Sequence, residues 1–221
     1  MQIDNVTLEW KGHAGFLIVC DDKRIYIDPY NLPAGAGNEK ADIILITHSH
    51  YDHCSIEDLT RIIKEGSVVV CPADCSSKLA KLNQNLNIKV VEPGQEIVVE
   101  NVKIKVVPAY NVDKQFHPKN EYWNGYIVEV GGKKIYHAGD TDLIPEMQQL
   151  TDLNIDVALL PVGGTYTMNA DEAVEACKII KPKKAVPMHF GSIVGTREDA
   201  ERFVELCKGE GVEAEVLGVS S

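Results

Sequence analysis

The chain has 221 residues, 44% hydrophobic and 25% charged, which suits one large globular domain or two small ones. Its 22 basic and 33 acidic residues give a net charge of -11, which argues against general electrostatic binding to nucleic acid or to an anionic membrane. No apolar run reaches the roughly 18 residues that a membrane-spanning helix needs, and the first residues do not resemble a signal peptide. We therefore expect a cytoplasmic protein with neither a nucleic acid nor a membrane as partner.

The first part of the chain is rich in short β-type segments that are separated by glycine or aspartate. The predicted strands are 7–10, 15–19, 24–27, 43–46, 67–71, 87–91, 97–99 and 102–107. A helix is expected to begin after Ser55, with Asp58 in a capping position. Pro72 opens a second predicted helix, which extends to about Leu82. Residues 108–124 show no clear period, and a polar, aromatic loop of this length is typical of a functional segment.

The second part of the chain repeats this pattern of strands followed by strand–helix alternation. Strands are predicted at 126–130, 134–138, 157–160, 185–188 and 214–217, and helices at 143–150, after Asn169, and from Thr196 to about Lys208. Two similar halves, about 1–110 and 120–221, follow each other without a linker. Packed sheet to sheet with helices outside, they would form a single α/β domain over 1–221, a four-layer αββα sandwich.

Residues 47–53 read T-H-S-H-Y-D-H and follow directly on a predicted buried strand. In an extended segment, side chains two residues apart point the same way, so His48 and His50 can reach one metal ion together. The chain then turns toward the next helix, and this turn lets Asp52 and His53 face a second point nearby. One catalytic ion seldom takes four ligands from so short a span. The string therefore favours two ions that share it.

Two further histidines also stand at the ends of predicted strands. His137 follows the strand residues Ile135 and Tyr136, and His189 follows the strand 185–188. Sheets of the α/β type place ligand sites at the carboxyl ends of their strands. We therefore expect both histidines to complete the metal site begun by residues 47–53.

Taken in order, these motifs resemble the metallo-β-lactamase superfamily over essentially the whole chain. The resemblance rests on the H-x-H-x-D-H string, on His-Ala-Gly-Asp at 137–140 and on the late His189. Shorter phrases resemble the branch that includes the ascorbate-6-phosphate lactonases and many other metal-dependent hydrolases. These phrases are Gly-His-Ala at 12–14, Ile-Asp-Pro at 27–29, His-Ala-Gly-Asp-Thr-Asp at 137–142 and Pro-Met-His-Phe-Gly at 187–191.

The resemblance implies seven ligands for two divalent ions and a water that bridges them. One ion would be held by His48, His50 and His137, the other by Asp52, His53 and His189, and Asp140 would bridge both. Mixed imidazole and carboxylate ligands suit zinc, and they also suit manganese or iron. We expect two Zn²⁺ ions, with Mn²⁺ or Fe²⁺ as alternatives.

Three residues are candidates for contact with the reacting atoms. Asp52 is expected to take the proton of the attacking water as the new bond forms. His13 either donates a hydrogen bond to the substrate or caps its turn. His117, in the loop 108–124, either protonates a leaving group or is an exposed loop residue. Asp28 and Thr47 are expected to orient ligand imidazoles, although the Asp28-Pro29 pair also suits a plain turn.

The chain contains six cysteines, and in a chain of this length without an export signal we expect reduced thiols. Cys54 directly follows His53. Because neighbours in sequence point apart, we expect Cys54 to be a small buried hydrophobic residue and not a metal ligand.

The leading hypothesis is a metal-dependent hydrolase whose two-metal centre activates water. Its substrate would be a small ester, lactone or phosphodiester. One alternative is an iron-dependent oxidoreductase on the same fold, and another is a non-catalytic metal-binding protein. The expected partner is a small-molecule substrate, and the sequence leaves a homo-oligomer open.

Overall fold

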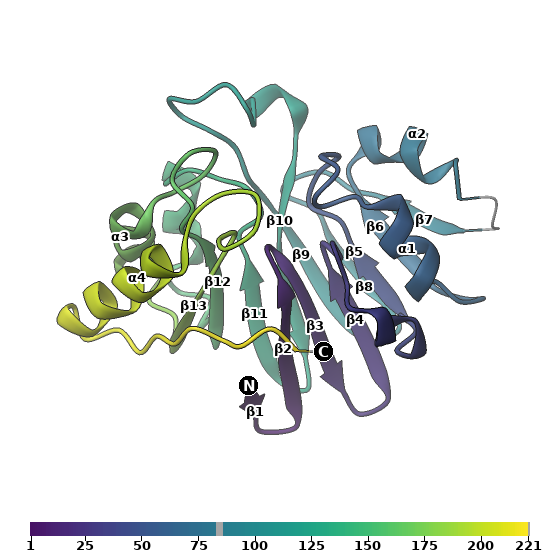
Figure 1. Cartoon of the computed structure of the whole chain (residues 1–221), viewed down its shortest axis with the longest axis horizontal. Coiled ribbons are helices and arrows are strands. Elements are labelled where there is room, and N and C mark those ends of the chain that lie inside the picture. Colours follow the sequence, from purple (N-terminus) through teal and green to yellow (C-terminus); the bar gives the residue numbers. More distant parts are fainter. Residues whose placement is uncertain (83–85, 221) are drawn as a thin grey trace.

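In the computed structural model, which describes residues 1–82 and 86–220, two β-sheets face each other and helices cover their outer sides (Figure 1). Helices α1 (Ile56–Ile62) and α2 (Ser76–Leu79) lie outside the first sheet, and α3 (Ala170–Ile180) and α4 (Arg197–Gly209) lie outside the second, so the molecule has the four layers expected of an αββα sandwich (Figure 1). The predicted α/β fold of the metallo-β-lactamase type is confirmed. A long loop between β9 (Val102–Pro108) and β10 (Asn124–Val130) rises over one end of the molecule (Figure 1).

The first sheet has seven strands in sequence order. They are β1 (Gln2–Ile3), β2 (Val6–Gly12), β3 (Gly15–Cys20), β4 (Lys23–Ile27), β5 (Ile43–Leu45), β6 (Val68–Cys71) and β7 (Asn87–Val90). Strands β1 to β4 form an antiparallel meander, and β4 to β7 pair in parallel. Parallel pairing aligns the carboxyl ends of these strands at one edge, where the loop after β5 emerges.

The second sheet has six strands and repeats the plan of the first. They are β8 (Glu96–Val99), β9 (Val102–Pro108), β10 (Asn124–Val130), β11 (Lys133–His137), β12 (Val157–Pro161) and β13 (Lys184–Met188). Strands β8 to β11 are antiparallel, and β11 to β13 are parallel. Strands β8 and β9 precede the division expected near residue 110, yet they belong to this sheet because β9 pairs with β10 over its length.

The helices begin at the capping residues that the sequence indicated. The α-helices are α1 (Ile56–Ile62), α2 (Ser76–Leu79), α3 (Ala170–Ile180) and α4 (Arg197–Gly209), and the 3-10 helices are η1 (Ala34–Asn38), η2 (Ala73–Cys75), η3 (Lys119–Glu121) and η4 (Pro145–Leu150). The Ser55 side chain accepts a hydrogen bond from Asp58 N, and Asn169 and Thr196 each form a full capping box.

Three predicted elements differ in the structure. The helix expected from Pro72 to Leu82 is a 3-10 turn followed by the single turn of α2, and the helix expected over 143–150 is the 3-10 helix η4. The strand expected over 214–217 is a single bridge between Ala214 and Ala185. Each is a short terminal or connecting segment, in which backbone hydrogen bonds to neighbours decide the conformation.

Side-chain alternation along the strands fills two separate cores. In β5, Ile43 and Leu45 face the second sheet, while Ile44 faces the layer that contains α1. Both faces of β5 are therefore buried, which fixes where its carboxyl end places the next residues. Among the described residues, no helix is both long and apolar enough to cross a membrane.

Candidate metal centre

The segment after β5 is fastened by backbone hydrogen bonds on both sides of the histidine string. The carbonyl of Ile46 accepts from Tyr126 Oη at 2.7 Å, and the carbonyl of Thr47 accepts from Asn124 N at 3.0 Å. The carbonyl of His50 then accepts from Cys54 N at 2.8 Å, which closes a tight turn. This turn carries the second half of the string back toward the first, as the sequence predicted.

Asp28 and Thr47 orient the first imidazoles of the site. Thr47 N and Thr47 Oγ1 donate to the Asp28 carboxylate at 2.8 and 2.6 Å. His48 Nδ1 lies 2.9 Å from Thr47 Oγ1, and His53 Nδ1 lies 2.7 Å from Asp28 Oδ2. Because these oxygens take the Nδ1 protons, the Nε2 atoms of His48 and His53 are the ring nitrogens that face the cluster, as in the outer hydrogen bonds of metal-ligating histidines.

His117 enters the same cluster from the loop between β9 and β10. Its Nδ1 lies 3.2 Å from Asn111 Oδ1 and 3.2 Å from the Tyr166 carbonyl. Its backbone N donates to Asn111 Oδ1 at 2.9 Å, and its carbonyl accepts from Asn111 N at 2.7 Å. His117 is thus held by Asn111 on both its backbone and its ring, with Nε2 aimed inward. It is not the exposed loop residue that was one of the two readings of the sequence.

Asp140 lies at the centre of the arrangement. Its Oδ2 is 3.0 Å from His189 Nε2, 3.2 Å from His117 Nε2 and 3.3 Å from His53 Nε2. The loop that delivers it needs Gly139, which has a φ of +65° and approaches Asn124 so closely that a Cβ would lie 2.6 Å from the Asn124 carbonyl. One carboxylate oxygen therefore faces imidazoles from three different loops.

The potential ligand atoms fall into three overlapping groups, each with atoms within 4.8 Å of one another. They are His48, His50 and His117; His13, Asp52, His53 and His189; and His48, His53 and Asp140. The third group contains members of both others. The structure thus brings six of the seven predicted ligands together around two neighbouring points.

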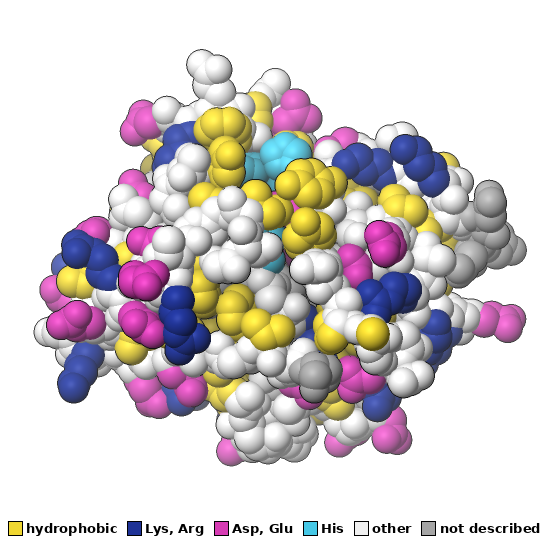
Figure 2. Space-filling model, in the orientation of Figure 1, with side chains coloured by type: hydrophobic (Ala, Val, Ile, Leu, Met, Phe, Trp, Pro, Cys, Tyr) yellow, Lys and Arg dark blue, Asp and Glu magenta, His cyan; other side chains and the backbone are white. Residues whose placement is uncertain are grey.

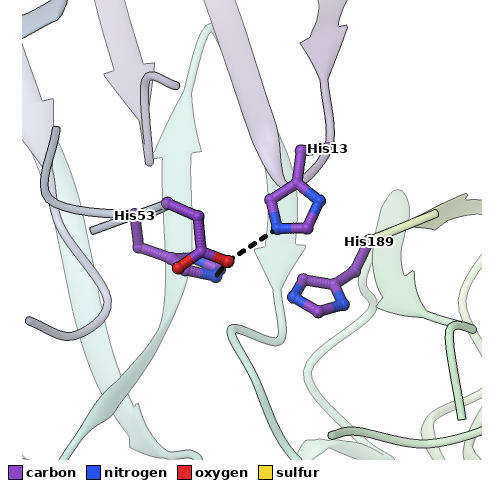
Figure 3. Close-up of side chains that lie close together, drawn as sticks. His13, His53 and His189 are labelled. Atoms are coloured by element: carbon purple, nitrogen blue, oxygen red, sulfur yellow. Dashed lines mark hydrogen bonds and ion pairs between the residues drawn. The ribbon is translucent and has the colours of Figure 1, made fainter. Parts of the chain in front are cut away.

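His13 joins the group that contains Asp52. Its Nε2 donates to Asp52 Oδ2 at 2.9 Å, the contact drawn as a dashed line in Figure 3. The ring centroids of His189 and His13 lie 4.2 Å apart, and the His13 carbonyl accepts a hydrogen bond from His189 N at 2.9 Å. Both residues adopt left-handed backbone conformations, with φ of +50° and +60°. The early turn and the loop after β13 therefore fold as one unit.

The structure does not bring His137 to the cluster. As the last residue of β11 it is fully buried, its Nε2 donates to the Ala14 carbonyl at 2.8 Å, and its Nδ1 accepts from Gly139 N at 3.1 Å. Neither ring nitrogen is free for a metal. The third histidine beside His48 and His50 is His117, whose place sequence reasoning missed because the loop 108–124 has no periodicity. The signal available in the sequence was Asn111, a polar residue of the same loop, which holds His117 in the structure.

Burial and charge set the protonation of the cluster. Burial and the neighbouring His53 lower the pKa of His48 well below its usual value, so its ring is neutral and ready to bind a metal. Burial acts to raise the pKa of Asp140, but His189 and His53 outweigh it, and this pKa lies well below the usual range. Asp140 is therefore a carboxylate at neutral pH.

Asp52 and His53 form the oppositely charged part of the same network. Burial raises the pKa of Asp52, but the hydrogen bond from His13 and the nearby charge of His53 bring it far below the usual range. Burial lowers the pKa of His53, whereas the charges of Asp140 and Asp28 raise it well above the usual value. Metal binding at His53 therefore has to displace a proton.

Several buried atoms of this cluster have no hydrogen-bond partner among the described residues. They are His13 Nδ1, His53 Nε2, His117 Nε2, Asp140 Oδ1, and both ring nitrogens of His189. Buried polar atoms left unpaired are costly, and such a concentration marks a site that is completed by another group. Imidazole nitrogens with a shared carboxylate are donors that suit divalent transition-metal ions, so the residues fit a metal centre.

A family profile described as the beta-lactamase superfamily domain matches residues 7–189. Relatives described as UPF0173 metal-dependent hydrolases include one from Thermococcus onnurineus, 40% identical over 220 residues that cover 96% of this chain and 95% of the relative. Another, from Thermus thermophilus, is 34% identical over 220 residues that cover 96% of each chain.

Solved structures agree with these sequence matches. A structure from Parabacteroides distasonis aligns with a TM-score of 0.84 at 30% identity and covers 97% of this chain and 94% of its own. Igni18, described as a metallo hydrolase from Ignicoccus hospitalis, aligns with a TM-score of 0.81 at 28% identity and covers 98% of this chain and 96% of its own.

Fold and sequence together define a metal-dependent hydrolase of the metallo-β-lactamase superfamily, as the motifs predicted. Within that superfamily, the chain belongs to the UPF0173 family of metal-dependent hydrolases. The narrower resemblance to the ascorbate-6-phosphate lactonases stays a prediction.

Proposed function

We propose that the chain is a hydrolase with a dinuclear metal centre, which acts on a small ester, lactone or phosphodiester. The observation that carries this proposal is the position of Asp140. Its Oδ2 lies within 3.3 Å of His117 on one side and of His53 and His189 on the other, so one carboxylate faces both ligand groups. A carboxylate between two sets of imidazoles suits two cations better than one.

In this proposal, one ion is held by His48, His50 and His117, and the other by Asp52, His53 and His189, with Asp140 shared. Such ions lower the pKa of water and polarise a carbonyl or phosphoryl oxygen. Zinc is the metal we propose, since three of the imidazoles are fixed by Nδ1 hydrogen bonds to oxygen, with manganese or iron as alternatives.

The chain's own residues hold and move the proton. Asp52 is a carboxylate, and its Oδ2 atom accepts a hydrogen bond from His13 Nε2 at 2.9 Å. We propose that Asp52 receives a proton from the attacking water while His13 fixes the orientation of the carboxylate. His117, proposed from the sequence as a proton donor to the leaving group, takes the role of a ligand in this arrangement.

The proposed location is the cytoplasm, and the proposed partner is a small molecule with no role for nucleic acid or a membrane. Support comes from the six cysteines, which are all buried free thiols, and from the net charge of -11.

The test is metal analysis of natively purified protein, followed by assays on a 4-nitrophenyl ester, a lactone and bis(4-nitrophenyl) phosphate. We expect two metal equivalents per chain, turnover that chelation abolishes and zinc restores, and no turnover by Asp140→Ala. An iron chromophore with oxidase activity would overturn the proposal in favour of an oxidoreductase. Absence of turnover with zinc, manganese and iron would favour a non-catalytic metal-binding protein.

A further inference from the structure

The metal centre opens into a small pocket with a polar floor and an apolar wall. The cavity has a volume of about 190 Å³, and its floor consists of His50, Asp52, His117, Asp140 and His189. The remaining lining residues form what we call the apolar wall, namely Tyr51, Phe116, Tyr166 and Ile193. Figure 2 shows histidine side chains at the surface with hydrophobic side chains beside them. Any substrate that reaches the floor must lie against this wall.

The wall is built from four separate loops, and two of its aromatic rings pack together. The Phe116 and Tyr166 rings meet edge to face, with centroids 4.6 Å apart. Tyr51 makes a similar edge contact with Tyr30 at 5.9 Å. Even so, Tyr51 is 61% exposed, Phe116 48% and Ile193 39%. Large apolar side chains left open beside a polar floor indicate a binding surface for an apolar group.

No lysine or arginine is among the nine residues that line this pocket. The lysines of the neighbouring loops are engaged elsewhere, since Lys114 pairs with Asp142 and Lys119 with Glu146, both at 2.8 Å or less. Lys78 donates to the Ser49 carbonyl. Recognition of a phosphate or carboxylate substituent needs such cations or a set of backbone amides. A charged substituent beside the wall would therefore lack a partner among the lining side chains.

The volume also indicates the size of the group that the hollow itself can enclose. Pockets for drug-sized ligands usually measure about 300–1,000 Å³, and an apolar cavity of about 150 Å³ holds benzene. A cavity of about 190 Å³ therefore accommodates one ring or a short alkyl chain.

From the apolar wall and the absence of lysine and arginine from the lining, we infer that the group bound beside the scissile bond is uncharged, and that it is a compact aryl or short alkyl group on the carbonyl of an ester or lactone. This inference rests on the proposed hydrolase function and favours carboxylic esters and lactones within it. In the reaction, the oxygen of water bonds to the carbonyl carbon and the bond from that carbon to the leaving oxygen breaks. One proton of the water goes to the leaving oxygen, and the acid formed releases its proton to solvent.

The test compares how fast the zinc-loaded protein hydrolyses two ester substrates that differ mainly in charge. 4-Nitrophenyl butyrate and 4-nitrophenyl hemisuccinate share a leaving group and a similar chain length, but only the second carries a carboxylate. We expect kcat/KM to be at least tenfold higher for the butyrate, and higher than for bis(4-nitrophenyl) phosphate. Equal or faster turnover of either anion would overturn the inference and leave the metal-dependent hydrolase standing. Failure on every substrate with every metal would remove both.

Variants of the wall give a second readout. We expect Phe116→Ala to raise KM for the butyrate about five- to twentyfold without changing metal content, and Ile193→Lys to shift preference toward the hemisuccinate by at least tenfold. Val98→Ala, at a side chain 64% exposed in β8, is the matched control and should change neither value. Unchanged KM and unchanged preference in both wall variants would contradict an apolar subsite.

Discussion

Two loops at the carboxyl ends of central strands each carry a histidine and an aspartate, and they contribute to the site differently. After β5, His48 binds Thr47 through Nδ1 and presents Nε2 to the cluster. At the end of β11, His137 has both ring nitrogens engaged by the backbone, and the residue that reaches the cluster is Asp140, three positions further on. A histidine at a strand end becomes a ligand only when its second nitrogen is left free.

The comparison is tested most strongly by His117→Ala, which removes the histidine that occupies the place expected of His137. Loss of a ligand should exceed the roughly 10- to 100-fold loss that follows removal of an outer partner, so metal affinity should fall by more than about 100-fold. Calorimetric titration of the metal-free protein measures this. His137→Ala is the matched control, and release of metal by that variant instead would reverse the assignment of the two histidines.

Asp28→Asn should have the next largest effect on metal binding. Asp28 accepts from Thr47 and from His53, so its charge fixes two imidazoles at once. We expect metal affinity to fall about 10- to 100-fold, as for other outer partners of metal-bound histidines. Asp42→Asn removes the same charge from a carboxylate that binds Lys64, and it should leave metal affinity unchanged. Equal effects of the two variants would show that charge, and not orientation, matters.

His137→Ala should change stability and not metal content. The substitution leaves the buried Ala14 carbonyl without its donor and opens a cavity beside Phe16. Together these should lower the free energy of unfolding by about 2–4 kcal/mol, measured by urea denaturation of the metal-free protein. We expect metal affinity to stay within about threefold of that of the parent protein, because the His137 ring contacts the backbone of Ala14 and Gly139 and none of the proposed ligand atoms. A loss of one metal equivalent would contradict this.

Cys54→Ala should have the smallest effect. Cys54 directly follows His53, but it is buried on the side of α1, in the core that contains Leu59 and Cys75. We expect unchanged metal affinity and a loss of stability of about 1 kcal/mol, typical of a small buried side chain. A change in the metal-centre spectrum of a cobalt-substituted protein would instead place the thiol at the metal.

The sequence was sufficient to predict the four layers, the capped helices at Ser55, Asn169 and Thr196, and the gathering of the string 47–53 into a potential metal site. The layers follow from strand alternation, and the string from side chains two apart on one short segment. The exchange of His117 for His137 was not predictable in this way. Whether His117 points inward depends on Asn111 and on the Tyr166 carbonyl, which lies 49 positions away in the sequence. A loop without period gives no local sign of such contacts.

The halves also show where sequence reasoning stops. The predicted division near residue 110 was placed at the long loop. In the structure, the chain passes from the first sheet to the second earlier, between β7 and β8. Register between β9 and β10, in which Pro108 pairs with Asn124, is decided by pairing across the loop 109–123. Strand patterns identify each strand, but they do not say which sheet receives it.

The positions of the two tryptophans should make the intrinsic fluorescence of the protein sensitive to metal binding. The chain has only Trp10 and Trp123. The Trp123 ring lies 4.8 Å from that of His48 and 4.9 Å from that of His50, while Trp10 stacks on Phe190, the residue after His189, at 4.8 Å. Each indole thus adjoins a different ligand group. Indole emission should therefore respond to metal binding, and replacing either tryptophan by phenylalanine would give a separate reading at each ligand group.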